Sequence, residues 1–244
     1  MSTIFKLCKR EIVAYLSSPA FYIFLVVFVG VSGAMFFYVG PVFSERFAQL
    51  NNFFTLLPFL LLCFVPAVAM RLWAEENKSG TTELLMTLPV RDWEAVIGKY
   101  LAALLVILLG LALTFPIPMI IAHLARKDTP LDLGPVWGGY VGMAAMGAVF
   151  LALANMLSAV TKNQVVAFIL GISACFGVFI LGRPPVLEHV PQQFVPFLSF
   201  VGVGGHLDGF AVGVFDTRSV LYFVTLVVVL LFATVRILES RRWR

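Results

Sequence analysis

The chain contains few charged residues for its length. Of its 244 residues only 12% are Asp, Glu, Lys or Arg, whereas 61% are hydrophobic. A soluble domain of this size carries roughly twice this charged fraction, so the composition excludes an ordinary soluble protein. It is typical of a polytopic membrane protein that forms one helical domain over residues 1–244. The net charge of +4 is therefore interpreted as a topology signal rather than as evidence for nucleic-acid binding.

Cysteine and histidine are too sparse and too scattered to form a metal centre. The three cysteines, Cys8, Cys63 and Cys175, lie far apart, and no Cys-x-x-Cys spacing occurs. The three histidines are dispersed as well, without a His-Glu-x-x-His pattern. A disulfide framework, a bound metal and a cofactor are all unsupported by these spacings.

The sequence also lacks a nucleotide-binding motif. The tripeptide Gly98-Lys99-Tyr100 has neither the upstream glycine nor the hydroxyl residue of a P-loop. The apolar runs contain no carboxylate pair and no arginine that is expected to be buried, which argues against a carrier driven by protons or sodium. No nucleophile has a partner in the sequence, so the chain is not expected to be an enzyme.

Six stretches are apolar enough to cross a membrane as helices, which takes about 18 residues for a ~30 Å hydrocarbon core. They are residues 20–39, 53–70, 95–124, 136–160, 165–181 and 220–238. Pro58 and Pro66 in the second stretch, and Pro116 and Pro118 in the third, are predicted kink points. The sequence therefore predicts an all-α polytopic membrane protein with six transmembrane helices.

Basic residues predict the orientation of these helices. With both termini in the cytosol, twelve Lys and Arg residues lie on the cytosolic side and five lie outside. By the positive-inside rule, we expect a multi-pass protein of the inner (plasma) membrane with cytosolic N- and C-termini. The five outside residues are Arg46, Arg126, Lys127, Arg183 and Arg218.

Residues 1–19 predict an amphipathic elbow helix that lies on the inner leaflet and ends at Ser17-Ser18-Pro19. Lys6, Lys9 and Arg10 form its basic face. The apolar face consists of Phe5, Cys8, Ile12, Tyr15 and Leu16. A plain basic anchor is the alternative interpretation.

Residues 71–99 form a charged segment between the second and third predicted spans, with four basic and five acidic residues. Ser79 can cap a short helix that runs to Leu88 and is ended by Pro89. In this helix Leu84, Leu85 and Leu88 share one side, and Glu75, Glu76 and Glu83 are expected to be more exposed. We therefore predict that residues 71–94 form a cytosolic segment whose short helix is joined rigidly to both spans. The alternative is a solvated loop whose charges only fix the topology.

Two further patterns concern packing and the outer side. Gly138-x-x-x-Gly142 gives the fourth span a small-residue face, which is expected to pack inside the bundle rather than in a dimer. The outer-side segment 182–219 is rich in glycine and aromatic residues, which is typical of short helices at the membrane interface.

Residues 74–90 resemble the coupling segment of ABC-2 type transporter permeases. The run is Ala-Glu-Glu-Asn-Lys-Ser-Gly-Thr-Thr-Glu-Leu-Leu-Met-Thr-Leu-Pro-Val, followed by Trp93 and Gly98-Lys99. The resemblance is greatest to the gliding-motility and nitrous-oxide-reductase-maturation branches. It extends over nearly the whole chain, from Ser17-Ser18-Pro19 to the tail that begins at His206.

The resemblance implies a permease subunit that binds cytosolic ABC ATPase subunits and pairs with a second copy or a paralogous permease. In this sequence Gly80, Thr81 and Glu83 match the coupling helix of the family. The residues expected to contact the ATPase subunit are Glu75, Glu76, Ser79, Gly80, Thr81, Glu83, Leu84, Leu85, Leu88 and Pro89.

The apolar spans and the outer segment favour an exporter or extractor of an amphipathic substrate, surrounded by membrane lipid. An alternative is a mechanotransmission or assembly scaffold, in which the ATPase acts on an extracytoplasmic accessory protein and no cargo moves. A third possibility is a channel or membrane enzyme that is independent of ATP.

Overall fold

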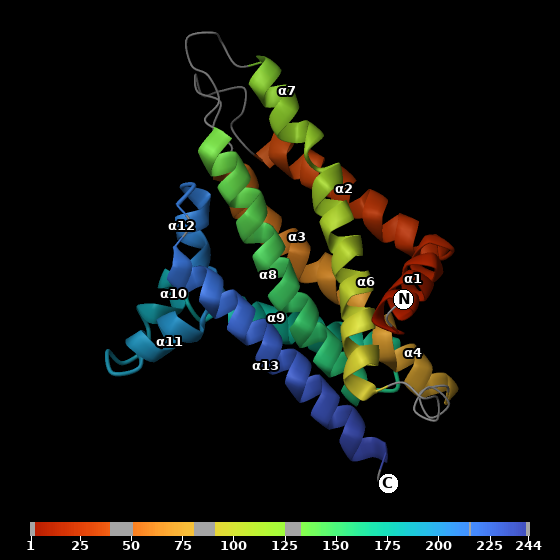
Figure 1. The fold of residues 1–244 in the computed structure, drawn as a ribbon. Coiled ribbons are helices and arrows are strands. Elements are labelled where there is room, and N and C mark those ends of the chain that lie inside the picture. Colours follow the sequence, from red (N-terminus) through yellow and green to blue (C-terminus); the bar gives the residue numbers. More distant parts are fainter. Residues whose placement is uncertain (1–2, 40–50, 81–90, 125–132, 215, 243–244) are drawn as a thin grey trace.

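The computed structural model describes residues 3–39, 51–80, 91–124, 133–214 and 216–242, and within these ranges the secondary structure is entirely helical (Figure 1). The long helices are α1 (Thr3–Leu16), α2 (Pro19–Val39), α3 (Asn51–Ala69), α6 (Asp92–Leu113), α8 (Leu133–Val160), α9 (Gln164–Ile180) and α13 (Thr217–Arg242). The short ones are α4 (Arg71–Ser79), α7 (Pro116–Leu124), α10 (Pro184–Leu187), α11 (Val195–Val201), η1 (Val203–Leu207) and α12 (Asp208–Ala211).

Five of the six predicted spans coincide with helices long and apolar enough to cross a membrane. The remaining predicted span, 165–181, coincides with α9, which has 17 residues and is shorter than the other five. The third predicted span is divided, because α6 ends at Leu113 and α7 begins at Pro116. A proline lacks the amide hydrogen that a continuing helix needs. Pro58 and Pro66, by contrast, lie inside α3 and do not end it.

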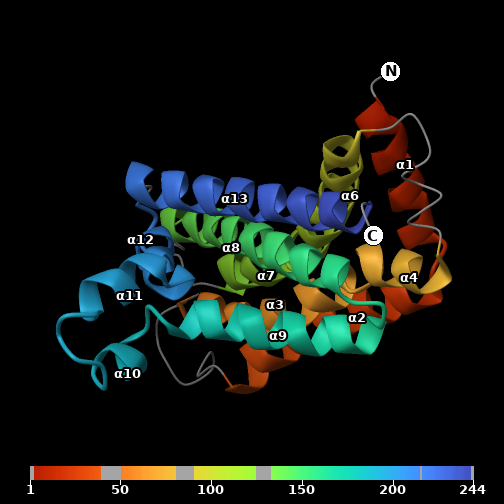
Figure 2. The ribbon, with the colours of Figure 1, turned by 90° about the horizontal axis from the view of Figure 1, so that it is seen from below.

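Helix α8 lies at the centre of the bundle and packs against α3, α6, α9 and α13. Figures 1 and 2 both show α1, α4 and the C-terminal end of α13 at one end of the molecule and α10–α12 at the other. The described chain therefore has its N-terminal helix and the end of α13 at the same end of the bundle.

The small-residue face of α8 packs inside the chain. A Cβ atom added at Gly138 would lie 2.3 Å from the backbone oxygen of Phe210, and one at Gly142 would lie 2.8 Å from Phe210 Cβ. Only glycine permits this separation, so α12 approaches the α8 backbone directly. The preference for packing inside the bundle is confirmed for these two glycines.

Other faces of the bundle are apolar and uncovered. Ile23 and Val26 on α2 are 63% and 69% exposed, and Val228 on α13 is 59% exposed. Such residues are unfavourable in water but favourable in hydrocarbon, where lipid tails cover them. Between α2 and α3 the Phe28 and Phe64 rings stack, with their centres 4.4 Å apart.

Helix α1 lies where the sequence predicts the elbow helix, and it packs mainly on α6. Leu7 and Tyr15 are buried, and the Tyr15 hydroxyl donates to the Val68 carbonyl at 2.9 Å. Phe5 and Leu16, two members of the predicted apolar face, are exposed. The helix therefore has one side against protein and another that is uncovered.

Residues 182–202 form a loop whose two ends are in direct contact. A Cβ atom added at Gly202 would lie 2.1 Å from the backbone nitrogen of Gly182, so the two backbones cross in direct contact. The Tyr222 hydroxyl donates to the Val201 carbonyl and ties the end of α11 to α13. The short helices predicted for segment 182–219 are present as α10, α11, η1 and α12.

Candidate functional site: the junction of α1, α4, α6 and α8

Helix α4 follows α3 after a single residue, Met70, whose amide still donates to the Pro66 carbonyl at 2.9 Å. Leu72, Trp73 and Ala74 on its first turn are buried. The helix ends at Gly80, whose φ of 73° is left-handed and suits glycine. The charged segment therefore starts as a direct extension of a membrane-length helix.

Ser79 is the last residue of α4. Its hydroxyl donates to the carbonyls of Glu75 and Glu76, at 3.0 and 3.3 Å. Serine side chains can bond local backbone groups at either end of a helix. The helix that Ser79 is predicted to cap, which runs to Leu88, lies outside the described residues.

Part of the predicted contact set lies on the surface of α4. Glu75 is exposed and forms an ion pair with Arg71 at 3.3 Å. Ser79 and Gly80 are exposed as well. The remaining members lie outside the described residues: Thr81, Glu83, Leu84, Leu85, Leu88 and Pro89.

Glu76 does not behave as predicted. The sequence placed it with Glu75 on the exposed side, but its side chain is only 20% exposed and points toward α6. Its Oε1 atom lies 2.7 Å from the Lys99 Nζ atom, which is the reason for its burial. Glu76 is therefore part of the interior contact of α4.

Lys99 is the centre of this contact, and its side chain is only 2% exposed. Its ammonium group donates to Glu76 at 2.7 Å, to Glu11 at 3.3 Å and to the Leu72 carbonyl at 2.9 Å. The same group lies 5.0 Å from the centre of the Trp73 ring, within cation–π range. We call Glu11, Leu72, Trp73, Glu76 and Lys99 the Lys99 cluster; it joins α1, α4 and α6.

The charges of the cluster are balanced by Arg10. Its guanidinium lies 2.9 Å from Glu11 and 3.7 Å from Glu76, so two cations meet two carboxylates. Burial alone would raise the pKa of Glu11, but Lys99 and Arg10 outweigh it and hold this pKa below its ordinary value of 4.5. Glu11 is therefore ionised at neutral pH and stays paired.

A second set of contacts fixes α4 to α8. The Trp73 indole donates to Asn155 Oδ1 at 2.9 Å, and both side chains are fully buried. The Ser158 hydroxyl accepts from the amides of Trp73 and Ala74, each at 3.2 Å, and donates to the Met70 carbonyl. Amides of a first helical turn need partners from outside the helix, and α8 supplies one here.

Asn77 makes the reciprocal contact at the end of α8. Its side-chain amide donates to the carbonyls of Ala159 and Thr161, at 3.3 and 2.9 Å. These carbonyls lie at the last turn of α8, where no further helical amide can reach them. Each helix thus satisfies the terminal backbone groups of the other, and α4 cannot shift without breaking these bonds.

Sequence reasoning missed Lys99, Glu11, Asn155, Ser158 and Asn77. One signal was present: Lys99 lies three residues after the buried Val96 and four before the buried Ala103, on one helical face. No pattern in the sequence pairs it with Glu11, which lies 88 positions away.

The site joins α1, α4, α6 and α8 through buried polar contacts. Among the described residues, no group of three or more His, Cys, Asp or Glu side chains is placed to hold a metal ion. Most of the polar groups pair with one another, although the buried Glu76 Oε2 and Asn155 Nδ2 atoms have no hydrogen-bond partner among the described residues. Glu75, Ser79 and Gly80 lie on the surface. The arrangement can transmit a displacement of α4 to α1, α3, α6 and α8 together.

Comparison with known families identifies the chain. Residues 39–201, more than half of the sequence, match the profile of a family described as ABC-2 family transporter protein. Among curated proteins, none matches the chain at a significant level. The matched region contains α3, α4, α6, α8 and α9. Together with the membrane-length helices, this match shows that the chain is a multi-pass membrane protein that belongs to the ABC-2 transporter family.

Proposed function

We propose that the chain is the transmembrane permease subunit of an ATP-driven ABC transporter, with energy supplied by a separate cytosolic ATPase subunit. The attachment of α4 supports this function best: the Lys99 cluster and the Trp73–Asn155 bond fix one short polar helix to three others, α1, α6 and α8. Force applied to the exposed side of α4 would therefore move the membrane helices instead of being absorbed by a loose linker.

Glu75, Ser79 and Gly80 form the described part of the proposed ATPase contact, and residues 81–89 contribute its remainder. Both termini and α4 lie at the cytosolic end, and two copies of the chain, or one copy and a paralogue, form the complete transporter. The likeness of residues 74–90 supports assignment to the gliding-motility or nitrous-oxide-reductase-maturation branch.

The first test is purification of the tagged chain from its own membranes. An ATPase with a P-loop should co-purify, and its hydrolysis rate should change when the permease is present. If no ATPase co-purifies and added ATPase is unaffected by the chain, the transporter function is refuted.

A charge reversal then locates the contact. Glu75→Lys should uncouple ATP hydrolysis from transport while leaving membrane insertion intact, because Glu75 is exposed and its ion pair with Arg71 is local. Glu188→Lys, the same change at an exposed residue beyond α10, is the matched control and should leave coupling unchanged. Equal coupling in both variants would place the ATPase elsewhere.

Apolar, uncovered helix faces favour an amphipathic cargo that is exported or extracted from the membrane. A second candidate is a scaffold that acts on an extracytoplasmic accessory protein without moving cargo. It is favoured by Phe194, at the start of α11, and Phe197, within α11, which are 55% and 65% exposed. Reconstituted vesicles containing a labelled amphiphile distinguish the two, because only the exporter moves label in an ATP-dependent manner.

A further inference from the structure

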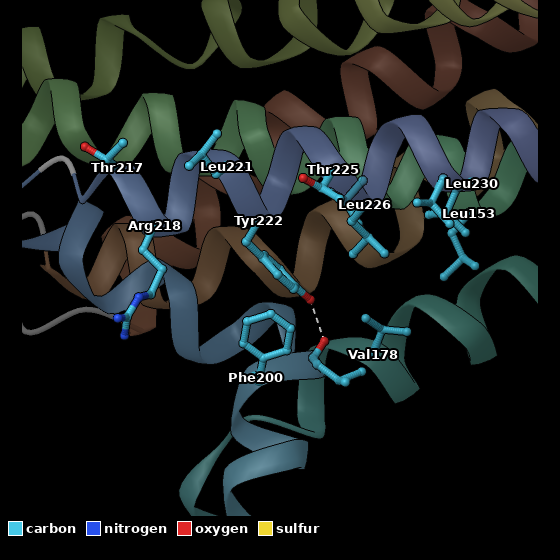
Figure 3. A pocket seen from close by; sticks show the side chains of 13 residues that line it. Leu153, Val178, Phe200, Thr217, Arg218, Leu221, Tyr222, Thr225, Leu226 and Leu230 are labelled. Carbon is cyan, nitrogen blue, oxygen red and sulfur yellow. Dashed lines mark hydrogen bonds between the residues drawn. The ribbon is translucent and has the colours of Figure 1, made fainter.

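A groove runs along α13 at the end of the molecule opposite to α4. Its walls come from α8, α9, α11 and α13, and its volume is about 740 Å³. The lining includes Leu153, Val178, Phe200 and Leu226 (Figure 3). Val229 lines it as well. It is open on one side, since Phe200 and Val229 are 59% and 55% exposed.

The length of the groove matches one membrane leaflet. It extends from Arg218 to Leu230 on α13, which is about 18 Å at 1.5 Å per helical residue. Half of a hydrocarbon core of ~30 Å is about 15 Å. An apolar slot of this length along a membrane-length helix fits an acyl chain that lies parallel to the helix.

One end of the groove is polar and cationic, because Thr217 and Arg218 line it there. The Arg218 side chain is exposed and, among the described residues, forms no ion pair or side-chain hydrogen bond. The nearby Asp216 carboxylate accepts from the backbone amide of Arg218 at 3.0 Å and so caps the first turn of α13. The guanidinium therefore remains available to an anion, for which its planar donors are suited.

The wall beside the cationic end is held in place by aromatic contacts. The Tyr222 hydroxyl donates to the Val201 carbonyl, as Figure 3 shows. On its other side Tyr222 stacks on the His206 ring at 4.1 Å, and the Phe200 ring lies 5.8 Å away. The groove is thus built by the fold itself, before any occupant arrives.

The geometry points to a binding site for one anionic phospholipid, with an acyl chain in the groove and its phosphate on Arg218. Apolar lining over one leaflet and a single unpaired cation at the end are the two features that such a lipid requires. The assignment to the outer leaflet rests on the proposed topology; the binding itself does not depend on ATP or on cargo movement.

Adjacent residues of α13 provide a matched test. Val229 lines the groove and Val228 does not, yet the two are 55% and 59% exposed, so neither supports the core. Tryptophan at position 229 fills the groove, whereas tryptophan at position 228 projects from another face. The chain and its variants are reconstituted with equal amounts of phosphatidylglycerol and phosphatidylcholine, extracted mildly, and analysed by native mass spectrometry.

Wild type and Val228→Trp should each retain about one phosphatidylglycerol per chain, whereas Val229→Trp should retain about tenfold less. Arg218→Gln should remove the preference for phosphatidylglycerol over phosphatidylcholine, and Arg218→Lys should keep most of it, because the cation remains. Equal retention in the two tryptophan variants would overturn the proposal. The proposal would also be overturned if Val229→Trp retained as much lipid as wild type but no longer formed a dimer, since a second copy of the chain would then occupy the groove. Lipid retention is measured without the ATPase, so a failure of the proposed transporter function would leave this result unaffected.

Discussion

The Lys99 ammonium lies 2.7 Å from the Glu76 carboxylate, and the lysine side chain is almost completely withdrawn from solvent. Removing one member of a buried ion pair leaves the other charge uncompensated, which costs about 3–5 kcal/mol. Lys99 also donates hydrogen bonds to Glu11 and the Leu72 carbonyl, so its loss affects α1 and α4 together.

We therefore expect Lys99→Met to lower the free energy of unfolding by about 3 kcal/mol or more. Thermal unfolding in detergent, followed by size-exclusion chromatography, measures the change. Lys78→Met, at an exposed position on α4, is the control and should have little effect. Adding Glu11→Gln and Glu76→Gln to Lys99→Met should recover part of the loss, and no recovery would argue against charge as its cause.

The Trp73–Asn155 bond gives a second prediction. Trp73→Phe leaves Asn155 Oδ1 buried without its donor, which costs about 1–3 kcal/mol. Adding Asn155→Leu removes the unsatisfied amide and should restore part of the stability, because replacing both partners by apolar groups is nearly neutral. Thermal unfolding of the two single variants and the double variant measures the coupling. Strictly additive losses would contradict the bond.

The contact between α8 and α12 gives a third prediction. Gly138→Ala places a methyl group 2.3 Å from the Phe210 carbonyl oxygen, and the backbone must move to relieve it. Overpacking of this kind costs about 1–3 kcal/mol. Gly177→Ala in α9 is the control, since its added Cβ atom would have no neighbour within 4 Å. That variant should be neutral or more stable by up to about 1 kcal/mol, owing to the higher helix propensity of alanine. Equal thermal midpoints in the two variants would refute the close approach.

The ion pairs that attach α1 to α6 give a fourth prediction, which concerns the pH dependence of stability. Because the pKa of Glu11 is held below 4.5 in the folded chain, its contribution to stability is present above pH 4.5. It is lost as the pH falls below this value and through the folded pKa. The difference in thermal midpoint between wild type and Glu11→Gln should therefore be largest near neutral pH and shrink in acid. A constant difference from pH 7 to pH 3 would show that Glu11 acts through packing rather than charge.

Much of the fold could be predicted from the sequence because membrane helices are specified by local composition. The predicted spans 20–39 and 136–160 differ from α2 and α8 by at most three residues at either end. The break after Leu113 was also expected, because Pro116 and Pro118 are local signals.

The interior polar contacts could not be predicted in the same way. Lys99 ends the charged segment 71–99 and falls within the predicted span 95–124, so composition alone names no partner for it. Its burial depends on Glu11 and Glu76, which the fold brings from α1 and α4. The Ser158 hydroxyl bonds likewise depend on how α8 crosses α4. Such pairings are properties of the assembled bundle and leave no periodic trace in the chain.

The crossing of Gly182 and Gly202 has a practical consequence for labelling the protein. Because the two backbones meet directly, the residues between them begin and end at nearly the same point. Extra residues placed between Gln192 and Gln193 would extend the tip without separating α9 from α13. That position therefore suits an epitope or a fluorescent tag, whose accessibility in intact cells would report which face of the membrane this end of the bundle occupies.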